Sequence, residues 1–386
     1  MTLKKICLLS TNLTFEGNVV FYLARLLSEN GFNVTLVAPH GKGLDRRESV
    51  DGIKIKRFHY CLPSFETLAL GSGIPENLKR NPLNWLLVPW FMLALSLKAI
   101  IEARKCDVLH AHWLPAGIAA LPAKYLLEKP VVLTLHGSDV RNKSPGIVGF
   151  FLRRFDAIIT GHDELLAIVK KSAPKKSHLI RNAVDFSALD KILSKLAAKK
   201  RLGVGGKTVM FVGRINNIKR PLDFIKAIPI VLKKRKDVKF VLVGDGPLEE
   251  ECKELARELG IEKNVIFTGR IKDTFNHLAA AEVFTALSDF ENAFSVSLVE
   301  AMLASVPCVI TKAGTTEKFF SHKKDCMLIP SKNPEELAKA ILFLIENNAK
   351  AKQIGIVGKE LAEKLGFGKE SIINQTLEIY DRVLQK

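Results

Sequence analysis

The chain alternates between short apolar runs and longer amphipathic segments, and this alternation predicts its secondary structure. The short runs are rich in β-branched residues, whereas the longer segments repeat apolar residues at helical spacing. Parallel sheets with crossover helices produce such a rhythm, because strands buried on both faces need continuous apolar sequence. The runs form two sets: KICLLST, NVTLVAP, VLHAH, VVLTLHG and AIITG come first, and TVMFVG, KFVLVGDG, VIFTG, VFTAL and PCVIT follow.

Between the two sets lies a stretch without an apolar run of strand length. Residues 196–207, LAAKKRLGVGGK, are charged and rich in glycine, which is typical of a domain boundary. We place the boundary within residues 186–207 and predict an α/β chain of two doubly wound domains, 1–190 and 191–370, that face each other across a cleft. Ligands of such sheets bind beyond the carboxyl ends of the strands, so functional residues are expected in the loops after the strands.

One apolar segment falls outside this rhythm. Residues 85–95, WLLVPWFMLAL, contain Pro89 and are soon followed by Ser96 and Lys98, so the run is expected to be too short to span a membrane. Two interpretations are open. The segment is a buried or half-buried helix, or it is an interfacial helix that rests on a membrane with Trp85 and Trp90 as anchors.

The composition adds a strong basic excess. The formal net charge is +18, and the excess is spread along the chain rather than gathered in a tail. This charge permits nucleic acid, an anionic membrane or a phosphate-bearing ligand as a partner. Because no aromatic-interleaved RNA-binding signature accompanies the basic runs, we predict no nucleic-acid partner and keep peripheral contact with an anionic membrane as a hypothesis.

The six cysteines lie far apart without a C-x-x-C pair, so neither a zinc knuckle nor a disulfide framework is indicated. The opening MTLKKICLLSTN holds only a short apolar run and is predicted to be a first strand rather than a signal peptide. We therefore expect reduced thiols and a cytoplasmic location, with peripheral contact to the cytoplasmic membrane face as the additional hypothesis.

The loop after the first strand of the second domain carries two cations. In VGRINNIKRP, residues 212–221, Arg214 and Lys219 lie on either side of a turn, where both can converge on one anion such as a diphosphate. The alternative is an ordinary surface loop, because two cations prove little in a basic chain. A dinucleotide oxidoreductase is disfavoured, since the turn after the first strand has a single glycine, Gly17, in place of G-x-G-x-x-G.

The stretch DFENAFSVSLVEAM, residues 289–302, is apolar except for its acidic residues. It follows the strand-like EVFTALS, and SVSLVEAML is predicted to be a helix. Ser297 and Glu300 fit an S-x-x-E capping box, in which case they only stabilise the helix start. Alternatively, the helix N-terminus offers backbone N–H groups to a phosphate while the acidic side chains accept hydrogen bonds from sugar hydroxyls. The residues alone favour neither interpretation.

In their order along the chain, these motifs resemble a known family. The segments HAHWLPAG, VVLTLHGSDV, RNAVD, VGRINNIK, VLVGDGPLEEE, VIFTGRI, ENAFSVSLVEAMLASVPCVIT and INQTLEIYDRVL span nearly the whole chain. Their order and spacing are similar to those of the retaining, nucleotide-sugar-dependent glycosyltransferases of GT-B fold, the group 1 or family 4-like enzymes. The resemblance implies two Rossmann-like domains and a C-terminal helix, residues 371–386, that crosses back to pack on the first domain.

The resemblance also assigns donor-binding residues, mostly in the second domain. It implies that Arg214 and Lys219 grip the diphosphate of the donor and that Glu300 binds the ribose hydroxyls. The base would contact the backbone at Arg270 and Ile271. The groups implied around the distal phosphate are the backbone amides near Phe294, Ser295 and Val296 and the turn at Gly17.

Residues near the transferred sugar follow from the same resemblance. His136 of HGSD would approach the donor sugar, and Asp139 would lie near the reacting centre or the acceptor. The family spacing puts a sugar-reading glutamate at position 292, where this chain has Asn292, and Glu291 stands one residue earlier. An inserted residue or a Glu-to-Asn exchange would produce this pattern. We favour Asn292, which keeps the spacing to the helix and can donate and accept hydrogen bonds, with Glu291 toward the rim.

The implied reaction moves a hexose from a nucleotide diphosphate sugar to a lipid, saccharide or small-molecule acceptor with retention of anomeric configuration. The nucleotide sugar is a co-substrate, and no cofactor or metal is expected, because no D-x-D motif occurs and two cations can neutralise the leaving diphosphate. Two other classes stay open. One is a non-catalytic sugar-nucleotide-binding protein of the same fold, and the other is a sugar-nucleotide epimerase, which would need acid and base carboxylates.

Overall fold

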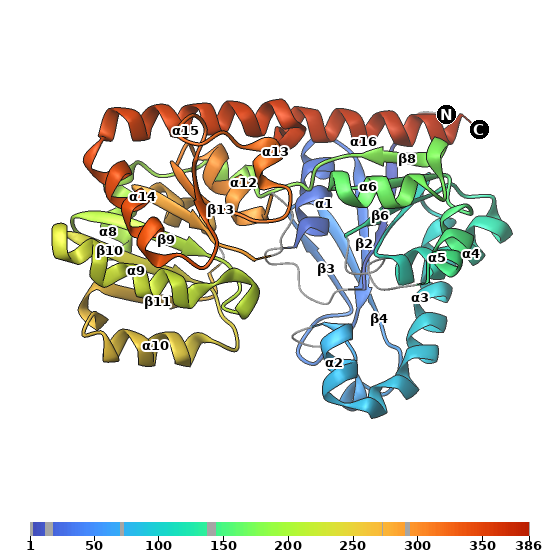
Figure 1. The fold of residues 1–386 in the computed structure, drawn as a ribbon. Helices are drawn as coiled ribbons and strands as arrows, with labels where there is room; N and C mark the ends of the chain where they lie inside the picture. The colour runs from blue at the N-terminus through green and yellow to red at the C-terminus, as the bar shows by residue number, and fades with distance from the viewer. Residues whose placement is uncertain are drawn as a thin grey trace. The chain divides into compact units, whose positions relative to one another are not determined.

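The computed structural model describes residues 3–11, 18–69, 73–136, 144–271, 273–289 and 294–385, which form two compact units. Unit 1 comprises Met1–Ala183 together with Lys369–Lys386, and unit 2 comprises Val184–Gly368. The units therefore divide after Ala183 and after Gly368, whereas the sequence analysis placed the domain boundaries after residues 190 and 370. Each unit contains a largely or wholly parallel sheet flanked by helices, so the predicted α/β class with two Rossmann-like domains is confirmed (Figure 1).

The sheet of unit 1 has eight strands among the described residues, in the order β3-β4-β2-β1-β5-β6-β7-β8. Neighbours pair in parallel except β3, which runs antiparallel to β4 at the edge. Strands β3, β4 and β8 were not predicted from the sequence. Charged residues interrupt the apolar pattern in β3 (RESV) and β4 (IKIKRF), and β8 (SHL) is very short. The strands are β1 (Lys5–Leu9), β2 (Asn33–Pro39), β3 (Arg47–Val50), β4 (Ile53–Phe58), β5 (Val108–His112), β6 (Val131–Leu135), β7 (Ala157–Thr160) and β8 (Ser177–Leu179).

Side chains on both faces of this sheet are buried. Cys7 and Leu9 of β1 belong to a core that includes α3 and α4, while Ile6, which points to the opposite face, is equally buried. On that opposite face the C-terminal helix α16 places Tyr380 against His110 of β5. The helices of unit 1 are α1 (Val19–Glu29), η1 (Pro63–Phe65), α2 (Ile74–Arg80), η2 (Pro82–Leu87), α3 (Val88–Ala103), α4 (Leu114–Leu127), α5 (Pro145–Leu152), α6 (Asp163–Lys170), η3 (Pro174–Lys176) and α16 (Lys369–Leu384).

The apolar segment at 85–95 is part of a longer helical stretch, in which the 3-10 helix η2 leads directly into α3. The stretch Pro82–Ala103 has 22 residues and contains an 18-residue window with a mean hydropathy of 1.8, enough in length and composition to cross a membrane. The expectation that the segment is too short was therefore wrong. Pro89 does not end the helix, because it lies in the first turn of α3, where its missing N–H has no intrahelical partner to lose.

The sheet of unit 2 has the order β11-β10-β9-β12-β13-β14, with all described pairs parallel. Its strands are β9 (Lys207–Val212), β10 (Val238–Val243), β11 (Val265–Gly269), β12 (Val283–Ala286), β13 (Cys308–Lys312) and β14 (Met327–Pro330), of which β14 was not predicted. The helices are α7 (Phe186–Leu189), α8 (Lys195–Leu202), η4 (Asn217–Lys219), α9 (Pro221–Lys234), α10 (Glu249–Glu258), η5 (Glu262–Asn264), α11 (Thr274–Ala279), α12 (Val296–Leu303), α13 (Thr316–Phe319), α14 (Pro334–Glu346), α15 (Asn348–Ala362) and η6 (Glu363–Phe367).

In both sheets the strand order reverses beside the first strand. The reversal lies between β1 and β5 in unit 1 and between β9 and β12 in unit 2. At such a switch point the loops after adjacent strands leave in opposite directions, which opens a crevice beyond their carboxyl ends. Each unit therefore has a defined edge at which a ligand site is expected.

Candidate functional site

Unit 2 has a pocket at its switch point, with an empty volume of about 410 Å³ including the part open to solvent. It lies beyond the carboxyl ends of β9, β12 and β13 and against the N-terminus of α12. A cation, several hydroxyl groups and the positive end of a helix meet there, which suits an anion. Its polar lining includes Lys219, Ser288, Ser295, Ser297 and Thr311.

Short-range contacts shape the loop that carries Lys219. The side chain of Asn216 caps η4 by accepting a hydrogen bond from the Lys219 N–H at 3.1 Å. A Cβ added to Gly246 would lie 2.3 Å from the carbonyl oxygen of Ile215, so the GDG motif supports the loop by close backbone approach. The half-buried Lys219 lines the pocket, whereas Arg214, the other predicted cation, is exposed at the start of the loop.

Helix α12 is capped by Ser295. Its hydroxyl accepts a hydrogen bond from the Leu298 N–H at 3.4 Å, and its backbone is extended as at other N-caps. Ser297 then lies in the first turn and Glu300 deeper in the helix, so the capping-box interpretation of these two residues is wrong. The first-turn amides of Val296 and Ser297 have no intrahelical acceptor, as at any helix start, and can donate to a bound anion.

Glu300 is a buried carboxyl without a polar partner in the described part of the chain. It is 3% exposed, and its carboxyl makes no hydrogen bond or ion pair with the residues that the structure describes. Burial, with a smaller contribution from the charge of Asp185, raises the pKa of Glu300 to about 8. The protonated form is therefore favoured at neutral pH. A carboxyl in such a poorly solvated position gains from hydrogen bonds, and a ligand with hydroxyl groups could supply them.

The other predicted donor residues of unit 2 follow strand ends or begin α12. Phe294 packs on three further phenylalanine rings with centroids 5.0, 5.1 and 5.2 Å away, so its side chain anchors the start of α12. Arg270 and Ile271 follow β11, which is separated from β9 by β10. Arg270 is exposed, and its Nε lies 3.6 Å from a carboxylate oxygen of Asp245 in the loop after β10.

Unit 1 has a pocket with an empty volume of about 340 Å³ including the part open to solvent, and three histidines are among its lining residues. His110 and His112 project from the same side of β5, and His136 follows β6. Nδ1 of His112 lies 3.1 Å from Nε2 of His136, and their rings stack with centroids 5.4 Å apart. Both nitrogens of His110 are engaged, one with the Tyr380 hydroxyl at 2.6 Å and the other with the Thr134 hydroxyl at 2.7 Å.

Burial keeps these three histidines neutral. It lowers the pKa of His110 to about 3, helped by the nearby His136, and lowers the pKa of His136 to about 3, helped by His162. The pKa of His112 is also well below its usual range, for the same reason. A neutral imidazole can orient a hydroxyl group but is a poor acid at neutral pH. His136 therefore suits contact with a sugar rather than proton donation.

His112 is a candidate that the sequence analysis did not single out. Its Nε2 is buried and has no hydrogen-bond partner among the described residues, although the side chain lines the pocket. Buried polar atoms are usually paired, so this nitrogen points to a ligand or a water molecule. The signal was present in HAHW, because residues two apart on a strand project from the same face.

Four predicted site residues lie outside the described residues: Gly17, Asp139, Glu291 and Asn292. Their roles, and the choice of Asn292 over Glu291, stay predictions. Within the described part of the chain, the side-chain group that could hold a metal ion is His40, His59 and Glu66, and these residues line neither pocket.

Two family models match the chain and together cover most of both units. The model described as Glycosyltransferase Family 4 matches residues 17–188. The model described as Glycosyl transferases group 1 matches residues 206–347.

Named relatives and solved structures match over most of their lengths. The N-acetyl-alpha-D-glucosaminyl L-malate synthase of Bacillus anthracis is 25% identical over 306 residues, which is 76% of this chain and 79% of that protein. The UDP-Gal:alpha-D-GlcNAc-diphosphoundecaprenol alpha-1,3-galactosyltransferase of Escherichia coli is 26% identical over 313 residues, 76% and 80% of the two chains. The crystal structure of Anabaena Alr3699/HepE in complex with UDP and glucose shares the fold with a TM-score of 0.74 at 20% identity, covering 98% of this chain and 100% of that one.

Proposed function

We infer the function from one premise: this chain belongs to the group 1 and family 4 glycosyltransferases of GT-B fold. It is an enzyme that transfers a sugar from a nucleotide sugar to an acceptor. We propose in addition that the donor is a nucleoside diphosphate hexose, that transfer retains the anomeric configuration, and that the catalytic step uses no metal ion.

The observation that supports this proposal is the combination of an anion pocket with a partnerless buried carboxyl. Lys219 and the free amides of Val296 and Ser297 suit a diphosphate. Glu300 follows Val296 by one helical turn, so it lies on the same side of α12. We propose that the phosphates and the ribose of one nucleotide occupy these two positions, with Glu300 bonded to ribose hydroxyls.

Other predicted residues receive supporting roles in this proposal. Arg214 adds a second cation to the diphosphate, and the backbone at Arg270 and Ile271 contacts the base. His136 orients a hydroxyl of the transferred sugar, and the ring of His112 holds His136 in place through their hydrogen bond.

The proposed chemistry depends on stabilising the leaving diphosphate. Negative charge grows on this group as the glycosidic bond breaks, and Lys219, Arg214 and the α12 amides are donors suited to it. Among the described lining residues of the two pockets there is no carboxylate that could act as a covalent nucleophile. We therefore propose that the leaving phosphate itself accepts the acceptor's proton on the face it departs from, which retains configuration.

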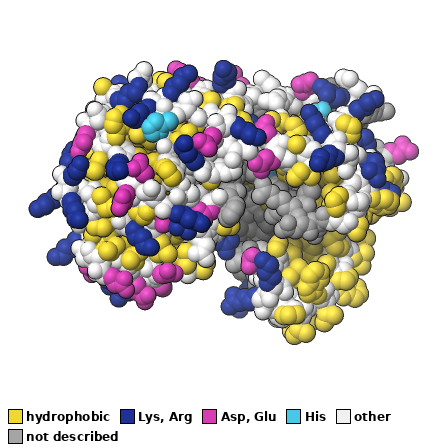
Figure 2. Space-filling view, viewed as in Figure 1, with side chains coloured by type: hydrophobic (Ala, Val, Ile, Leu, Met, Phe, Trp, Pro, Cys, Tyr) yellow, Lys and Arg dark blue, Asp and Glu magenta, His cyan; other side chains and the backbone are white. Residues whose placement is uncertain are grey.

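We propose that the acceptor is lipid-linked and that η2 and α3 rest on an anionic membrane. This helical stretch exposes large apolar side chains at helical spacing, and Figure 2 shows hydrophobic side chains gathered over this part of unit 1. Exposed patches of this kind mark interaction surfaces. The exposed residues, which we call the α3 face, are Leu83, Trp85, Leu86, Trp90, Leu93, Leu97 and Ile101.

Burial of the opposite side of α3 favours resting on a membrane over crossing it. Phe91 and Leu95 are fully enclosed in the core of unit 1, and a spanning helix would have to withdraw them. Tryptophan side chains on the α3 face suit the interface between headgroups and acyl chains. The exposed cations Arg80, Arg104 and Lys105 flank the stretch and suit anionic headgroups.

The test is a transfer assay on the full chain with UDP-, GDP- and ADP-hexoses, lipid-phosphate and saccharide acceptors, and chelator present. We expect one donor to react, with the anomeric configuration of the product, read from NMR coupling constants, the same as in the donor. Inverted product, or transfer that requires added divalent ion at the catalytic step, would contradict the proposal. Nucleotide binding without turnover would identify a binding protein, and isomerised donor sugar would identify an epimerase.

A further inference from the structure

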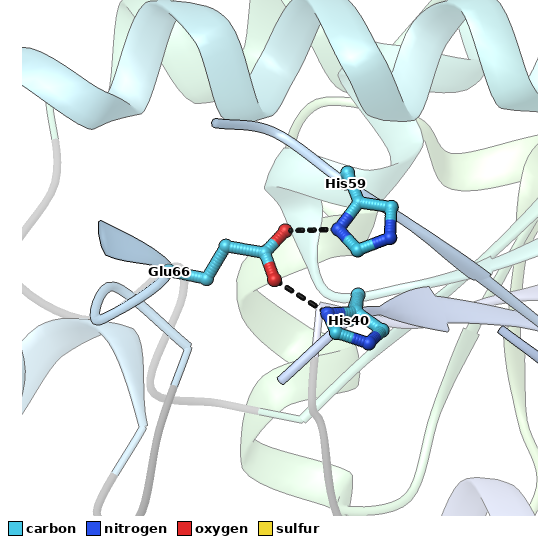
Figure 3. Close-up of side chains that lie close together, drawn as sticks. All are labelled: His40, His59 and Glu66. Atoms are coloured by element: carbon cyan, nitrogen blue, oxygen red, sulfur yellow. Dashed lines mark hydrogen bonds and ion pairs between the residues drawn. The ribbon is translucent and has the colours of Figure 1, made fainter. Parts of the chain in front are cut away.

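Outside both pockets, unit 1 contains a group of side chains whose atoms are close enough together to hold a metal ion (Figure 3). His40 directly follows β2, and His59 directly follows β4. Because β2 and β4 are neighbouring parallel strands, their carboxyl ends bring the two rings together, with centroids 4.0 Å apart. Glu66 directly follows η1 and reaches both rings from the same end of the sheet.

The carboxylate of Glu66 lies between the two Nδ1 atoms. Nδ1 of His40 is 2.5 Å from one carboxylate oxygen, and Nδ1 of His59 is 3.0 Å from the other. The backbone N–H of Tyr60 donates to the second oxygen at 3.3 Å. Glu66 is 2% exposed and His40 is 9% exposed, whereas the half-buried His59 gives the group a route to solvent.

The second nitrogen of His40 is fixed by the backbone. Nε2 lies 2.9 Å from the carbonyl oxygen of Leu44, which can only accept a hydrogen bond, so Nε2 carries a proton. Nδ1 of a neutral His40 then presents a lone pair to a carboxylate oxygen of Glu66. Two lone pairs at this distance require a proton between them, and a metal ion can take the place of that proton once the two atoms move apart. Metal-binding histidines commonly donate their second N–H to a backbone carbonyl in this way.

We propose that His40, His59 and Glu66 bind one divalent transition-metal ion of the zinc type. Two imidazole nitrogens and one carboxylate oxygen are ligands that zinc takes at about 2.0–2.2 Å, with water completing the coordination. Ligand atoms around tetrahedral zinc lie roughly 3.4 Å apart. The candidate atoms here all lie within 4.8 Å of one another, so small side-chain rotations form the site. Magnesium and calcium fit less well, because they favour oxygen ligands.

The ion would fix the segment on which α3 rests, which is a role separate from sugar transfer. Tyr60, next to His59, packs against Phe91 of α3 with ring centroids 5.1 Å apart. The Tyr60 hydroxyl accepts a hydrogen bond from the Leu68 N–H at 3.1 Å. A metal ion held by His59 and Glu66 therefore closes the loop between β4 and α2 and supports the base of the α3 face.

The test measures zinc content and thermal stability of the full chain after removal of any affinity tag. His59→Gln is the test variant, because this half-buried residue can change with little cost to packing. His277→Gln in unit 2 is the matched control, since His277 is also half-buried and its Nδ1 contacts the Asp273 carbonyl oxygen at 2.8 Å. We expect wild type and control to retain one zinc ion per chain after gel filtration and to melt at lower temperature with chelator. His59→Gln should bind zinc more weakly by more than about 100-fold.

Equal zinc retention by wild type and His59→Gln would overturn the proposal, as would the absence of retained zinc from wild type. Titration with cobalt(II) gives an independent measurement that does not require substitution of the buried His40 or Glu66. Visible absorption bands of nitrogen-bound, low-coordinate cobalt are expected for wild type and His277→Gln but not for His59→Gln. A wild-type spectrum identical to that of cobalt in water would also overturn the proposal.

Discussion

Glu66 in unit 1 and Glu300 in unit 2 are both buried carboxyls, but their surroundings are opposite. Glu66 contacts two imidazole rings and a backbone N–H, whereas Glu300 has no polar partner among the described residues and has a pKa raised to about 8. Burial favours the protonated form of a carboxyl unless a cation or hydrogen-bond donors compensate. Equal burial therefore does not mean an equal role: the partnered carboxyl organises its own loop, and the partnerless one is suited to a ligand.

Removing the partnered carboxyl should have the largest effect. Glu66→Gln replaces the carboxylate that contacts Nδ1 of both His40 and His59, so two charge-assisted contacts are lost and we expect the free energy of unfolding to fall by about 3–5 kcal/mol. Urea titration monitored by circular dichroism measures this change. A loss no larger than that of an exposed control such as Glu76→Gln would show that the group does not organise unit 1.

The same change at Glu300 should act in the opposite direction, with an effect that grows as the pH rises from 4.5 to 8. The pKa of Glu300 is about 8 when folded and has an ordinary value of 4.5, so its contribution to stability is full below pH 4.5 and is lost as the pH rises through 8. Each unit of pKa shift is worth about 1.4 kcal/mol, so the wild type should lose several kcal/mol across this window. Glu300→Gln should not.

Melting temperatures of both proteins at pH 5 and pH 8.5 measure this difference. We expect Glu300→Gln to gain on the wild type as the pH rises. A gap between the two proteins that does not depend on pH would mean that Glu300 ionises as an ordinary glutamate.

Lys219→Ala should weaken binding of the nucleoside diphosphate by about 1.5–3 kcal/mol, because it removes a charge-assisted hydrogen bond. Arg235→Ala is the control, since Arg235 pairs with Asp237 on the surface of unit 2 at 2.8 Å and lines neither of the two pockets described above. Isothermal titration with whichever of UDP, GDP or ADP binds gives both affinities. Equal losses in both variants would indicate nonspecific attraction by the basic chain.

Substitutions on the α3 face should have the smallest effect on the activity of the isolated enzyme. Their effect should be seen only when membranes are present. Replacing Trp85 and Trp90 together by serine removes apolar area from the interface, and we expect roughly tenfold weaker binding to anionic liposomes. Leu196→Ser in unit 2, also at a highly exposed apolar position, is the control. Failure of the wild type to float with anionic liposomes at low salt, where attraction is strongest, would exclude the membrane role.

The sequence predicted the strands that carry the sites but missed β3, β4, β8 and β14. Strands β1, β6 and β9 are mostly apolar and β5 adds two buried histidines to its apolar residues, because both faces of these strands are buried. The edge strand β3 and its neighbour β4 alternate charged and apolar residues and therefore lack that signal. The length of the apolar helical stretch was underestimated, since the sequence does not show that η2 leads directly into α3 with Pro89 in the first turn.

The two buried glutamates also differ in whether the sequence alone could assign them to a site. Glu300 could be proposed from sequence, because the order of motifs around it fixes its position relative to Lys219. The cluster of His40, His59 and Glu66 could not, because no regular spacing links these residues and only the pairing of β2 with β4 brings the histidines together. The pocket beside Lys219 was expected at the strand ends. The role of Ser295, which caps α12 at the edge of this pocket, could not be predicted without knowing where the helix begins.

The most direct test of the ribose-binding role of Glu300 combines a protein change with a ligand change. Affinities of wild type and Glu300→Gln are measured by titration calorimetry for the nucleoside diphosphate and for its 2′-deoxy and 3′-deoxy counterparts. We predict that Glu300→Gln and the loss of a contacted hydroxyl each weaken binding by about 1.5–3 kcal/mol, and that the two losses overlap rather than add. Fully additive losses, or unchanged affinity in Glu300→Gln, would contradict the assignment of the partnerless carboxyl to the nucleotide.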